Sequence, residues 1–272
     1  MVRGAAARLD AEPVTGFKQR VIRAFGAASQ YDRLAYVQQQ VAAALAQRIG
    51  ALSAQARILE VGCGTGFVAA AMPALPEGTD WLMTDVSPDM VERSRLRFGG
   101  RPPFRFAILD AEHPSFETQE PPFDLICSSL AAQWFENLEP TLGQLFGLLK
   151  PGGRMLVSTL ANGTFAEWHA AHAAVSLIAG TPTYPDRAEL DAIRLDGQAG
   201  DVAIERFTST YASGRDFLRT LRAIGAATPR PSHQPLSPRA MRKVLRAFEA
   251  GGARVSWDVA FCSFVRPEGA GR

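Results

Sequence analysis

The feature that most constrains the fold is a change of hydrophobic period over residues 57–72. Arg57 to Val61 form a short, β-branched apolar run, and a loop from Gly62 to Gly66 with glycine at alternate positions follows directly. Helical spacing of apolar residues then resumes over residues 67–72. This order predicts a strand, a tight loop and a helix in succession.

The same alternation continues along the chain and predicts the fold class. Ser87 followed by Pro88 is a helix start signal, and Pro-Gly-Gly at residues 151–153 is a helix stop signal. Strands that alternate with helices at this spacing imply right-handed crossovers, so we expect an α/β fold with a doubly wound, mostly parallel sheet. Ligands of such sheets bind at the carboxyl ends of the strands. The expected strands are residues 80–85, 104–109, 123–128 and 154–159, and the expected helices between them are residues 88–98 and 138–149.

Both flanks of this core are predicted to be largely helical. Before it, we expect a loose tail over residues 1–15 and helices over residues 16–25 and from residue 29 or 32 to 49. After it, we expect helices over residues 165–178, 188–193, 214–224 and 238–250, the last with Ser237 as its N-cap, and strands over residues 203–211 and 255–265. A single domain over residues 16–272 then consists of N-terminal helices (16–56), a cofactor-binding core (57–160), a helical cap on the acceptor side (161–250) and a final strand.

Composition excludes several classes of protein. Hydrophobic residues make up 47% of the 272 residues and charged residues 21%, which is typical of a folded globular protein. Three widely spaced cysteines argue against a disulfide scaffold or a zinc site, and the four histidines have no metal-ligand spacing. The chain has no apolar run long enough to span a membrane and no export signal at its start, so we expect a cytoplasmic protein without a metal.

The glycine loop indicates the size of the cofactor. A dinucleotide fingerprint needs glycine at the sixth position from Gly62, where this chain has Phe67, and the Gly-Lys-Ser/Thr of a phosphate-binding P-loop is absent. A smaller cofactor is therefore expected. Asp85 ends the second predicted strand, where a carboxylate can accept two hydrogen bonds from a ribose diol. Asp110 follows the third strand, where it can receive an exocyclic amine.

These residues carry a family resemblance. The Glu-x-Gly-x-Gly-x-Gly loop that begins at Glu60, Asp85, Leu-Asp-Ala at 109–111, Phe-Asp-Leu-Ile at 123–126 and Leu-Lys-Pro-Gly-Gly at 149–153 together resemble the class I S-adenosylmethionine-dependent methyltransferases. The resemblance covers residues 57–160 and implies a Rossmann-like core with S-adenosylmethionine as the cofactor. It also implies a set of cofactor-binding residues: Glu60, Gly62, Gly64, Gly66, Asp85, Val86, Asp110, Ala111 and Ser128.

A narrower resemblance extends into the flanks. Residues 25–32, 129–134, 159–164 and 217–226 are similar, in order, to the malonyl-[acyl-carrier-protein] O-methyltransferases of biotin synthesis. This resemblance implies an enzyme that methylates the free carboxylate of a malonyl thioester, with acyl carrier protein or coenzyme A as the carrier and no nucleic-acid or membrane partner. Two alternatives stay open: a methyltransferase of small carboxylates or phenols, and a methyltransferase-like assembly factor without methyl transfer. The oligomeric state also stays open.

The implied acceptor decides which catalytic residues to expect. A malonyl carboxylate is already ionised at neutral pH, so the chemistry needs positioning and not a general base. Arginine is the best bidentate partner of a carboxylate, and Arg219 and Arg222 lie three residues apart in the matching segment; the alternative is the solvated face of an amphipathic helix. We expect the Tyr31 hydroxyl to reach the cofactor's carboxylate or the acceptor, and Trp134 to face the methyl group; the alternative for both is aromatic packing.

Charge is distributed unevenly along the chain. The net charge is +4 over residues 1–56, −8 over residues 57–200 and +6 over residues 201–272. In the last segment, Arg239, Arg242, Lys243 and Arg246 recur at helical spacing and so share one side of the predicted helix 238–250. Acyl carrier proteins are strongly acidic as a family, so we expect this basic stripe to steer the carrier protein; the alternative is a solvated helix face.

Overall fold

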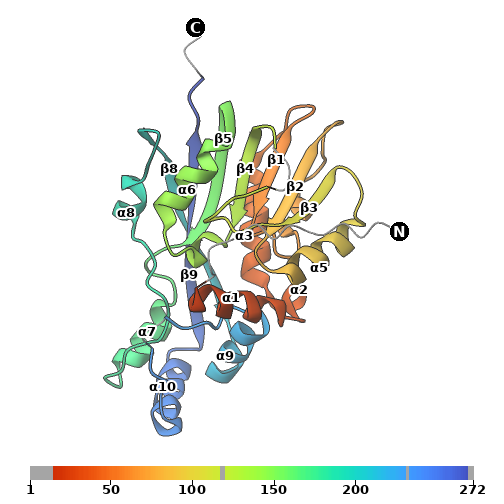
Figure 1. Cartoon of the computed structure of the whole chain (residues 1–272). Helices are drawn as coiled ribbons and strands as arrows, with labels where there is room; N and C mark the ends of the chain where they lie inside the picture. Colours follow the sequence, from red (N-terminus) through yellow and green to blue (C-terminus); the bar gives the residue numbers. More distant parts are fainter. Residues whose placement is uncertain (1–14, 117–119, 231–232, 269–272) are drawn as a thin grey trace.

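One seven-stranded sheet forms the centre of the molecule (Figure 1). The computed structural model describes residues 15–116, 120–230 and 233–268, so the expected tail, apart from Thr15, lies outside the described residues. The strands are β1 (Arg57–Val61), β2 (Asp80–Asp85), β3 (Phe104–Ile108), β4 (Phe123–Ser129), β5 (Leu149–Leu160), β8 (Asp201–Thr210) and β9 (Arg254–Val265). They lie in the order β3-β2-β1-β4-β5-β9-β8, with β1 to β5 parallel and β9 antiparallel to both neighbours. The prediction of a doubly wound, mostly parallel sheet is confirmed.

Helices cover both faces of the sheet and one of its ends. They are α1 (Gly16–Gly26), α2 (Tyr31–Leu34), α3 (Tyr36–Ile49), α4 (Phe67–Ala71), α5 (Pro88–Phe98), α6 (Leu138–Gly147), α7 (Ala166–Ala173), α8 (Arg187–Ala192), α9 (Gly214–Ala223) and α10 (Pro238–Ala250). Buried apolar side chains form two clusters, and consecutive strand residues such as Ile58 and Leu59 belong to different clusters because they point to opposite faces. Figure 1 shows α1, α2, α7, α9 and α10 gathered at one end of the sheet.

Two expected helices are shorter than the sequence predicted. The helix expected to reach residue 49 is broken at Ala35, whose ψ of 51° is not helical, so that α2 is a single turn that carries Tyr31. The helix expected over residues 165–178 ends at Ala173 as α7, before Ser176 with its φ of +58°. Apolar spacing continued through both breaks, which explains why the pattern did not reveal them.

The Pro-Gly-Gly stop signal belongs to a strand and not to a helix end. α6 ends at Gly147, and Leu149 already pairs with Phe123, so residues 151–153 lie inside β5 where its register with β4 shifts. A Cβ at Gly153 would approach the Phe123 carbonyl oxygen to 3.0 Å, which accounts for glycine there. The sequence also gave no signal for the short hairpin of β6 (Arg194–Leu195) and β7 (Gln198–Ala199), or for the 3₁₀ turn η1 (Ala132–Trp134).

Close backbone contacts hold α1 across the end of the sheet. Arg93 of α5 donates hydrogen bonds of 2.6 and 2.7 Å to the carbonyl oxygens of Gly26 and Ala28. On the other side, Gly225 after α9 has a φ of +75°, and a Cβ there would lie 2.9 Å from the Cα of Phe25. The segment 217–226, singled out by its resemblance, therefore packs directly against the helix that covers the site.

Candidate active site

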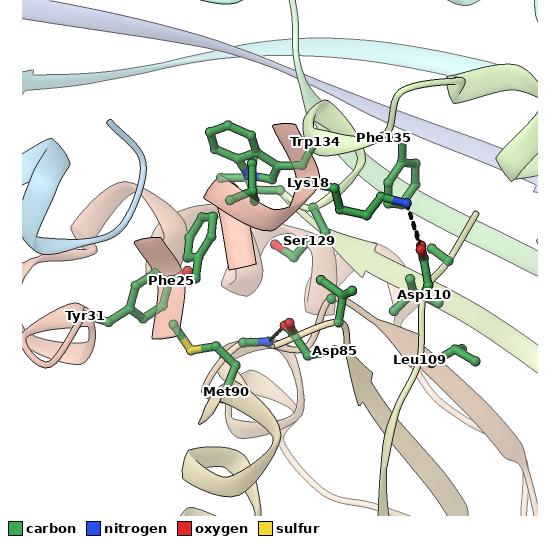
Figure 2. A pocket seen from close by; sticks show the side chains of 18 residues that line it. Lys18, Phe25, Tyr31, Asp85, Met90, Leu109, Asp110, Ser129, Trp134 and Phe135 are labelled. Atoms are coloured by element: carbon green, nitrogen blue, oxygen red, sulfur yellow. Dashed lines mark hydrogen bonds and ion pairs between the residues drawn. The ribbon is translucent and has the colours of Figure 1, made fainter. Parts of the chain in front are cut away.

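One cavity lies where the carboxyl ends of β1, β2 and β4 meet α1, close to the point where the strand order reverses between β1 and β4. It has a volume of about 90 Å³. Figure 2 shows Phe25, Tyr31 and Trp134 on one side of it, and Leu109, Asp110 and Phe135 on the other. Of the expected cofactor-binding residues, this cavity is lined by Gly62, Gly64, Asp85, Val86, Asp110 and Ala111.

Asp85 is the carboxylate at the centre of the cavity. Its Oδ1 accepts a 2.8 Å hydrogen bond from the Ser87 backbone N–H, and its Oδ2 accepts a 2.9 Å bond from that of Gly64. Burial raises the pKa of Asp85 to about 6, although these backbone hydrogen bonds oppose the rise. Each oxygen keeps a further lone pair, so the carboxylate can accept from both hydroxyls of a ribose.

The three loop glycines serve different purposes. Gly62 has a φ of +66°, and a Cβ there would lie 2.3 Å from the Ala131 side chain. Gly64 has a φ of +55° and faces the Tyr31 hydroxyl. Gly66 does not line the cavity. It packs against Phe98, and a Cβ at Gly66 would lie 2.4 Å from the Phe98 ring. The placement expected for Gly66 is corrected accordingly: it supports the loop from behind.

Glu60 and Ser128 also lie behind the cavity and do not line it. Glu60 is 1% exposed, and its Oε2 accepts a 3.0 Å hydrogen bond from Trp81 Nε1. Burial raises the pKa of Glu60 to about 8 against the opposing effect of that bond. Ser128 is buried in β4, and Ser129, the next residue, lines the cavity instead because strand side chains alternate.

A lysine that the sequence analysis missed joins α1 to the loop after β3. Lys18 is 8% exposed, and its Nζ lies 2.8 Å from Asp110 (Figure 2). The same Nζ lies 2.5 Å from Glu112. Burial alone would lower the pKa of Lys18, but hydrogen bonds and charge attraction from the two carboxylates outweigh it and raise the pKa. The available signal was compositional: Lys18 is one of three lysines among 29 basic residues.

A second, smaller cavity of about 30 Å³ adjoins the first and shares Phe25, Tyr31, Leu130 and Trp134 with it. Tyr31 stacks on Phe67 at a centroid distance of 5.5 Å, and Phe25 meets Trp134 edge-on at 5.6 Å. Burial raises the pKa of Tyr31, so its hydroxyl stays protonated. We call this second space the acceptor cavity; its other lining residues are Gln38, Gln133, Leu160, Phe165, Tyr184, Ala226 and Trp257.

The two candidate arginines are placed elsewhere. Arg219 and Arg222 lie on the exposed face of α9, and neither lines either cavity. Arg219 pairs with Asp216, whereas Phe217 and Leu221 on the opposite face are buried. The amphipathic helix turns its apolar side inward, so the structure does not bring these arginines to either cavity, and their role toward the acceptor stays a prediction.

The described part of the chain contains no cluster of metal-ligating side chains. Within residues 15–116, 120–230 and 233–268, no group of three His, Cys, Asp or Glu side chains could hold a metal ion. His169 contacts Thr181, and His172 contacts the Trp168 carbonyl oxygen. None of the helices described has the length and apolar character needed to cross a membrane.

These features define a class of protein. A parallel sheet with one reversed strand, a glycine loop after β1 and a carboxylate at the end of β2 is the arrangement of the class I S-adenosylmethionine-dependent methyltransferases. Residues 59–155 match the family model of a methyltransferase domain. The fold is shared with the YcgJ protein of Bacillus subtilis, with a TM-score of 0.57 at 17% identity over 84% of this chain and 99% of that one. Phosphoethanolamine N-methyltransferase 2 of Haemonchus contortus, in complex with S-adenosyl-L-methionine, has a TM-score of 0.55 at 18% identity over 94% of this chain and 61% of that one.

Two curated relatives narrow the class to a family. The malonyl-[acyl-carrier protein] O-methyltransferase of Magnetococcus marinus is 38% identical over 252 residues, which are 91% of this chain and 92% of that protein. The biotin biosynthesis bifunctional protein BioCD of Bordetella avium is 42% identical over 89% of this chain, and the match spans 51% of that longer protein. The chain belongs to the malonyl-[acyl-carrier protein] O-methyltransferase family, and its cofactor is S-adenosylmethionine.

Proposed function

We propose that the protein transfers the methyl group of S-adenosylmethionine to the free carboxylate of a malonyl thioester on acyl carrier protein, as a step of biotin synthesis. Relatives with these names, 38 and 42% identical to this chain, support the assignment. The observation that carries it is the chemistry of the acceptor cavity. No carboxylate, histidine, lysine or cysteine is among the described residues that line it.

A cavity without a base suits an acceptor that needs no deprotonation. A phenol must lose a proton before or during methyl transfer, whereas a carboxylate is already ionised at neutral pH. Tyr31 and Tyr184 are poor bases there, because burial raises the pKa of each. The acceptor cavity therefore favours a carboxylate over the alternative phenol, and an intact cofactor pocket argues against an assembly factor without methyl transfer.

The cofactor pocket fits S-adenosylmethionine through groups that suit a nucleoside. Asp85 would accept hydrogen bonds from the ribose hydroxyls, and Gly62 and Gly64 would let the backbone approach the amino-acid part. Asp110, beside the apolar side chains of Val86 and Leu109, would receive the adenine amine. Glu60, Gly66 and Ser128 hold the loop and β4 in place from behind.

Catalysis then consists of alignment and exclusion of water. Bound S-adenosylmethionine supplies the methyl group; a malonyl oxygen takes it, the carbon–sulfur bond breaks, and sulfur keeps the electron pair. Tyr31 and Trp134, which line both cavities, stand where donor and acceptor meet. Holding two reactants in line can supply roughly 7 to 11 kcal/mol of the barrier.

Helix α10 provides the surface for the carrier protein. Val244, Leu245 and Phe248 are buried, and the four basic residues expected on the opposite side are exposed: Arg239, Arg242, Lys243 and Arg246. α9 packs beside it, where a Cβ on Gly214 would lie 2.6 Å from Leu245, and it adds the exposed arginines of its outer face. Figure 1 places both helices at the end of the sheet where α1 covers the site.

The test is methyl transfer to a panel of acceptors. Purified protein with labelled S-adenosylmethionine should form a base-labile methyl ester on malonyl-carrier protein, and none on acetyl-carrier protein, which lacks the carboxylate. Malonyl-coenzyme A, a free dicarboxylate and a phenol in the same panel separate the carrier and the two alternative acceptors. Labelling of the phenol in preference to every malonyl compound would overturn the proposal.

A further inference from the structure

Three buried polar atoms around the acceptor cavity have no partner in the protein. They are Nε1 of Trp134, Nε1 of Trp257 and Oε1 of Gln133, and all three residues line the cavity. Trp257 is 3% exposed and comes from the first half of β9, more than 120 residues after Trp134 in the sequence. Because buried polar groups in folded proteins are nearly always paired, three such atoms around one cavity indicate the place of a polar ligand.

The chemistry of these atoms specifies what the ligand offers. An indole N–H can only donate, so the two tryptophans require an acceptor. The Gln133 Nε2 donates a 2.6 Å hydrogen bond to the Leu130 carbonyl oxygen, which fixes the amide and leaves Oε1 as an acceptor that requires a donor. The residues that line the cavity thus carry two unpaired neutral donors and one unpaired neutral acceptor, and no arginine or lysine is among the described lining residues.

Neutral donors suit this transfer better than an arginine. The acceptor carboxylate is fully charged before transfer and loses charge as it bonds to the methyl group. A guanidinium would bind the starting carboxylate more strongly than the transition state, which raises the barrier. Two indole N–H groups align the carboxylate with less of this penalty, and the positive sulfonium of the bound cofactor supplies the attraction.

We propose that Trp134 and Trp257 hold the malonyl carboxylate through their indole N–H groups, and that Gln133 accepts an amide N–H of the carrier's pantetheine arm. This inference rests on the proposed function and assigns the specificity for a carboxylate-ended acyl group to neutral donors. The acceptor oxygen of Gln133 repels a carboxylate, so the same cavity sets the direction in which the malonyl thioester enters.

The experiment measures discrimination between two thioesters by the whole protein. With S-adenosylhomocysteine present, binding of malonyl-coenzyme A and of acetyl-coenzyme A is compared in wild type, Trp257→Phe and Trp134→Phe. We expect each variant to lose about 10- to 100-fold in affinity for the malonyl compound, the effect of removing a hydrogen bond to a charged group. Affinity for acetyl-coenzyme A should change less than about twofold, and kcat/KM for malonyl thioester should fall with the malonyl affinity.

A matched control separates this role from packing. Trp168→Phe removes an indole from the same buried cluster without touching the acceptor cavity, and it should leave the preference for malonyl over acetyl intact. Equal loss for both thioesters in Trp257→Phe, or no loss in either variant, would overturn the inference. A wild-type protein that prefers the malonyl compound yet forms no methyl ester would instead contradict the proposed function. The inferred binding of the malonyl carboxylate by the two tryptophans would then still hold.

Discussion

The cofactor pocket and the acceptor cavity share Tyr31 and Trp134 but are built in opposite ways. In the cofactor pocket, the two carboxylates are paired within the protein: Asp85 with two backbone N–H groups, and Asp110 with Lys18. In the acceptor cavity, polar atoms are neutral and three of them are left without partners. The protein therefore holds charged groups in fixed positions for the cofactor. For the acceptor it provides neutral hydrogen-bonding atoms that have no partner within the protein.

Of the changes considered for the charged groups of the cofactor pocket, removal of Lys18 should have the largest effect. Lys18→Met leaves Asp110 and Glu112 facing one another without a cation, which should lower the free energy of unfolding by about 3 kcal/mol. Urea denaturation followed by circular dichroism measures this. Lys150→Met is the matched control, because Lys150 also contacts both oxygens of one aspartate, Asp124, at 2.9 Å but in an exposed position. Lys150→Met should lower the free energy of unfolding by less than about 1 kcal/mol. An equal loss in the two variants would contradict a stabilising role of the buried Lys18 ion pairs.

Replacement of Asp85 tests how the charged groups of the cofactor pocket contribute to the affinity for the cofactor. Asp85→Ala should weaken S-adenosylmethionine by roughly 1.5 to 3 kcal/mol, the effect of losing charge-assisted hydrogen bonds, as measured by calorimetry. Asp80→Ala changes the same residue type at the other end of β2, where the side chain pairs with Arg57 and Arg105, and should leave the cofactor's affinity unchanged. Unchanged affinity in Asp85→Ala would remove Asp85 from the pocket's function.

Glu60 tests the part of the charged side that lies behind the cavity. Burial raises its pKa to about 8, so between its ordinary value and pH 8 the folded protein keeps a proton that the unfolded chain has lost. The contribution of Glu60 to the free energy of unfolding therefore falls as the pH rises through that window. The free energy of unfolding of Glu60→Gln, relative to that of wild type, should accordingly rise by about 2 kcal/mol from pH 6 to pH 8.

Chemical denaturation at several pH values gives this difference. Glu120→Gln is the control, because hydrogen bonding to Arg105 lowers the pKa of Glu120 and its difference from wild type should be flat above pH 6. A flat difference for Glu60→Gln as well would show that Glu60 is ionised in the folded protein.

The smallest expected effect concerns the approach to the acceptor side. Reversing Arg242 and Arg246 to Glu should lower kcat/KM for malonyl-carrier protein by about tenfold at low salt, with less effect on malonyl-coenzyme A, because long-range steering acts on a large acidic partner. Added salt should reduce the wild-type rate toward that of the variant. The same reversal at Arg95 of α5 and Arg101 in the loop after this helix, both exposed, is the control. Equal rates for wild type and the α10 variant on the carrier protein would assign docking to another surface, such as Arg20 and Arg23 of α1.

Much of the cofactor pocket could be predicted from the sequence because its parts are local. Local patterns in the chain indicate the apolar strand before Gly62, the glycine loop, and Asp85 at the end of the next strand. The ends of these strands meet at one edge because the sheet is parallel. Helix α10 was predicted to the residue, because its cap Ser237 and its apolar period are both local signals. Arg219 and Arg222 were candidates because arginine pairs well with a carboxylate, but both are exposed on α9, as the alternative of a solvated amphipathic face predicted.

The acceptor side was decided by the tertiary structure alone. Trp134 follows β4, Tyr184 lies between α7 and α8, and Trp257 sits in β9, and nothing in the residues next to each one indicates that they line a common cavity. Likewise, Lys18 pairs with carboxylates 92 and 94 positions away. The sequence by itself determined the sheet, the glycine loop and the carboxylate that face the cofactor, because hydrogen-bonded periods and turn residues act over a few positions. Which neutral groups surround the acceptor depends on long-range packing, where the energy of a contact is set by residues that the local pattern does not contain.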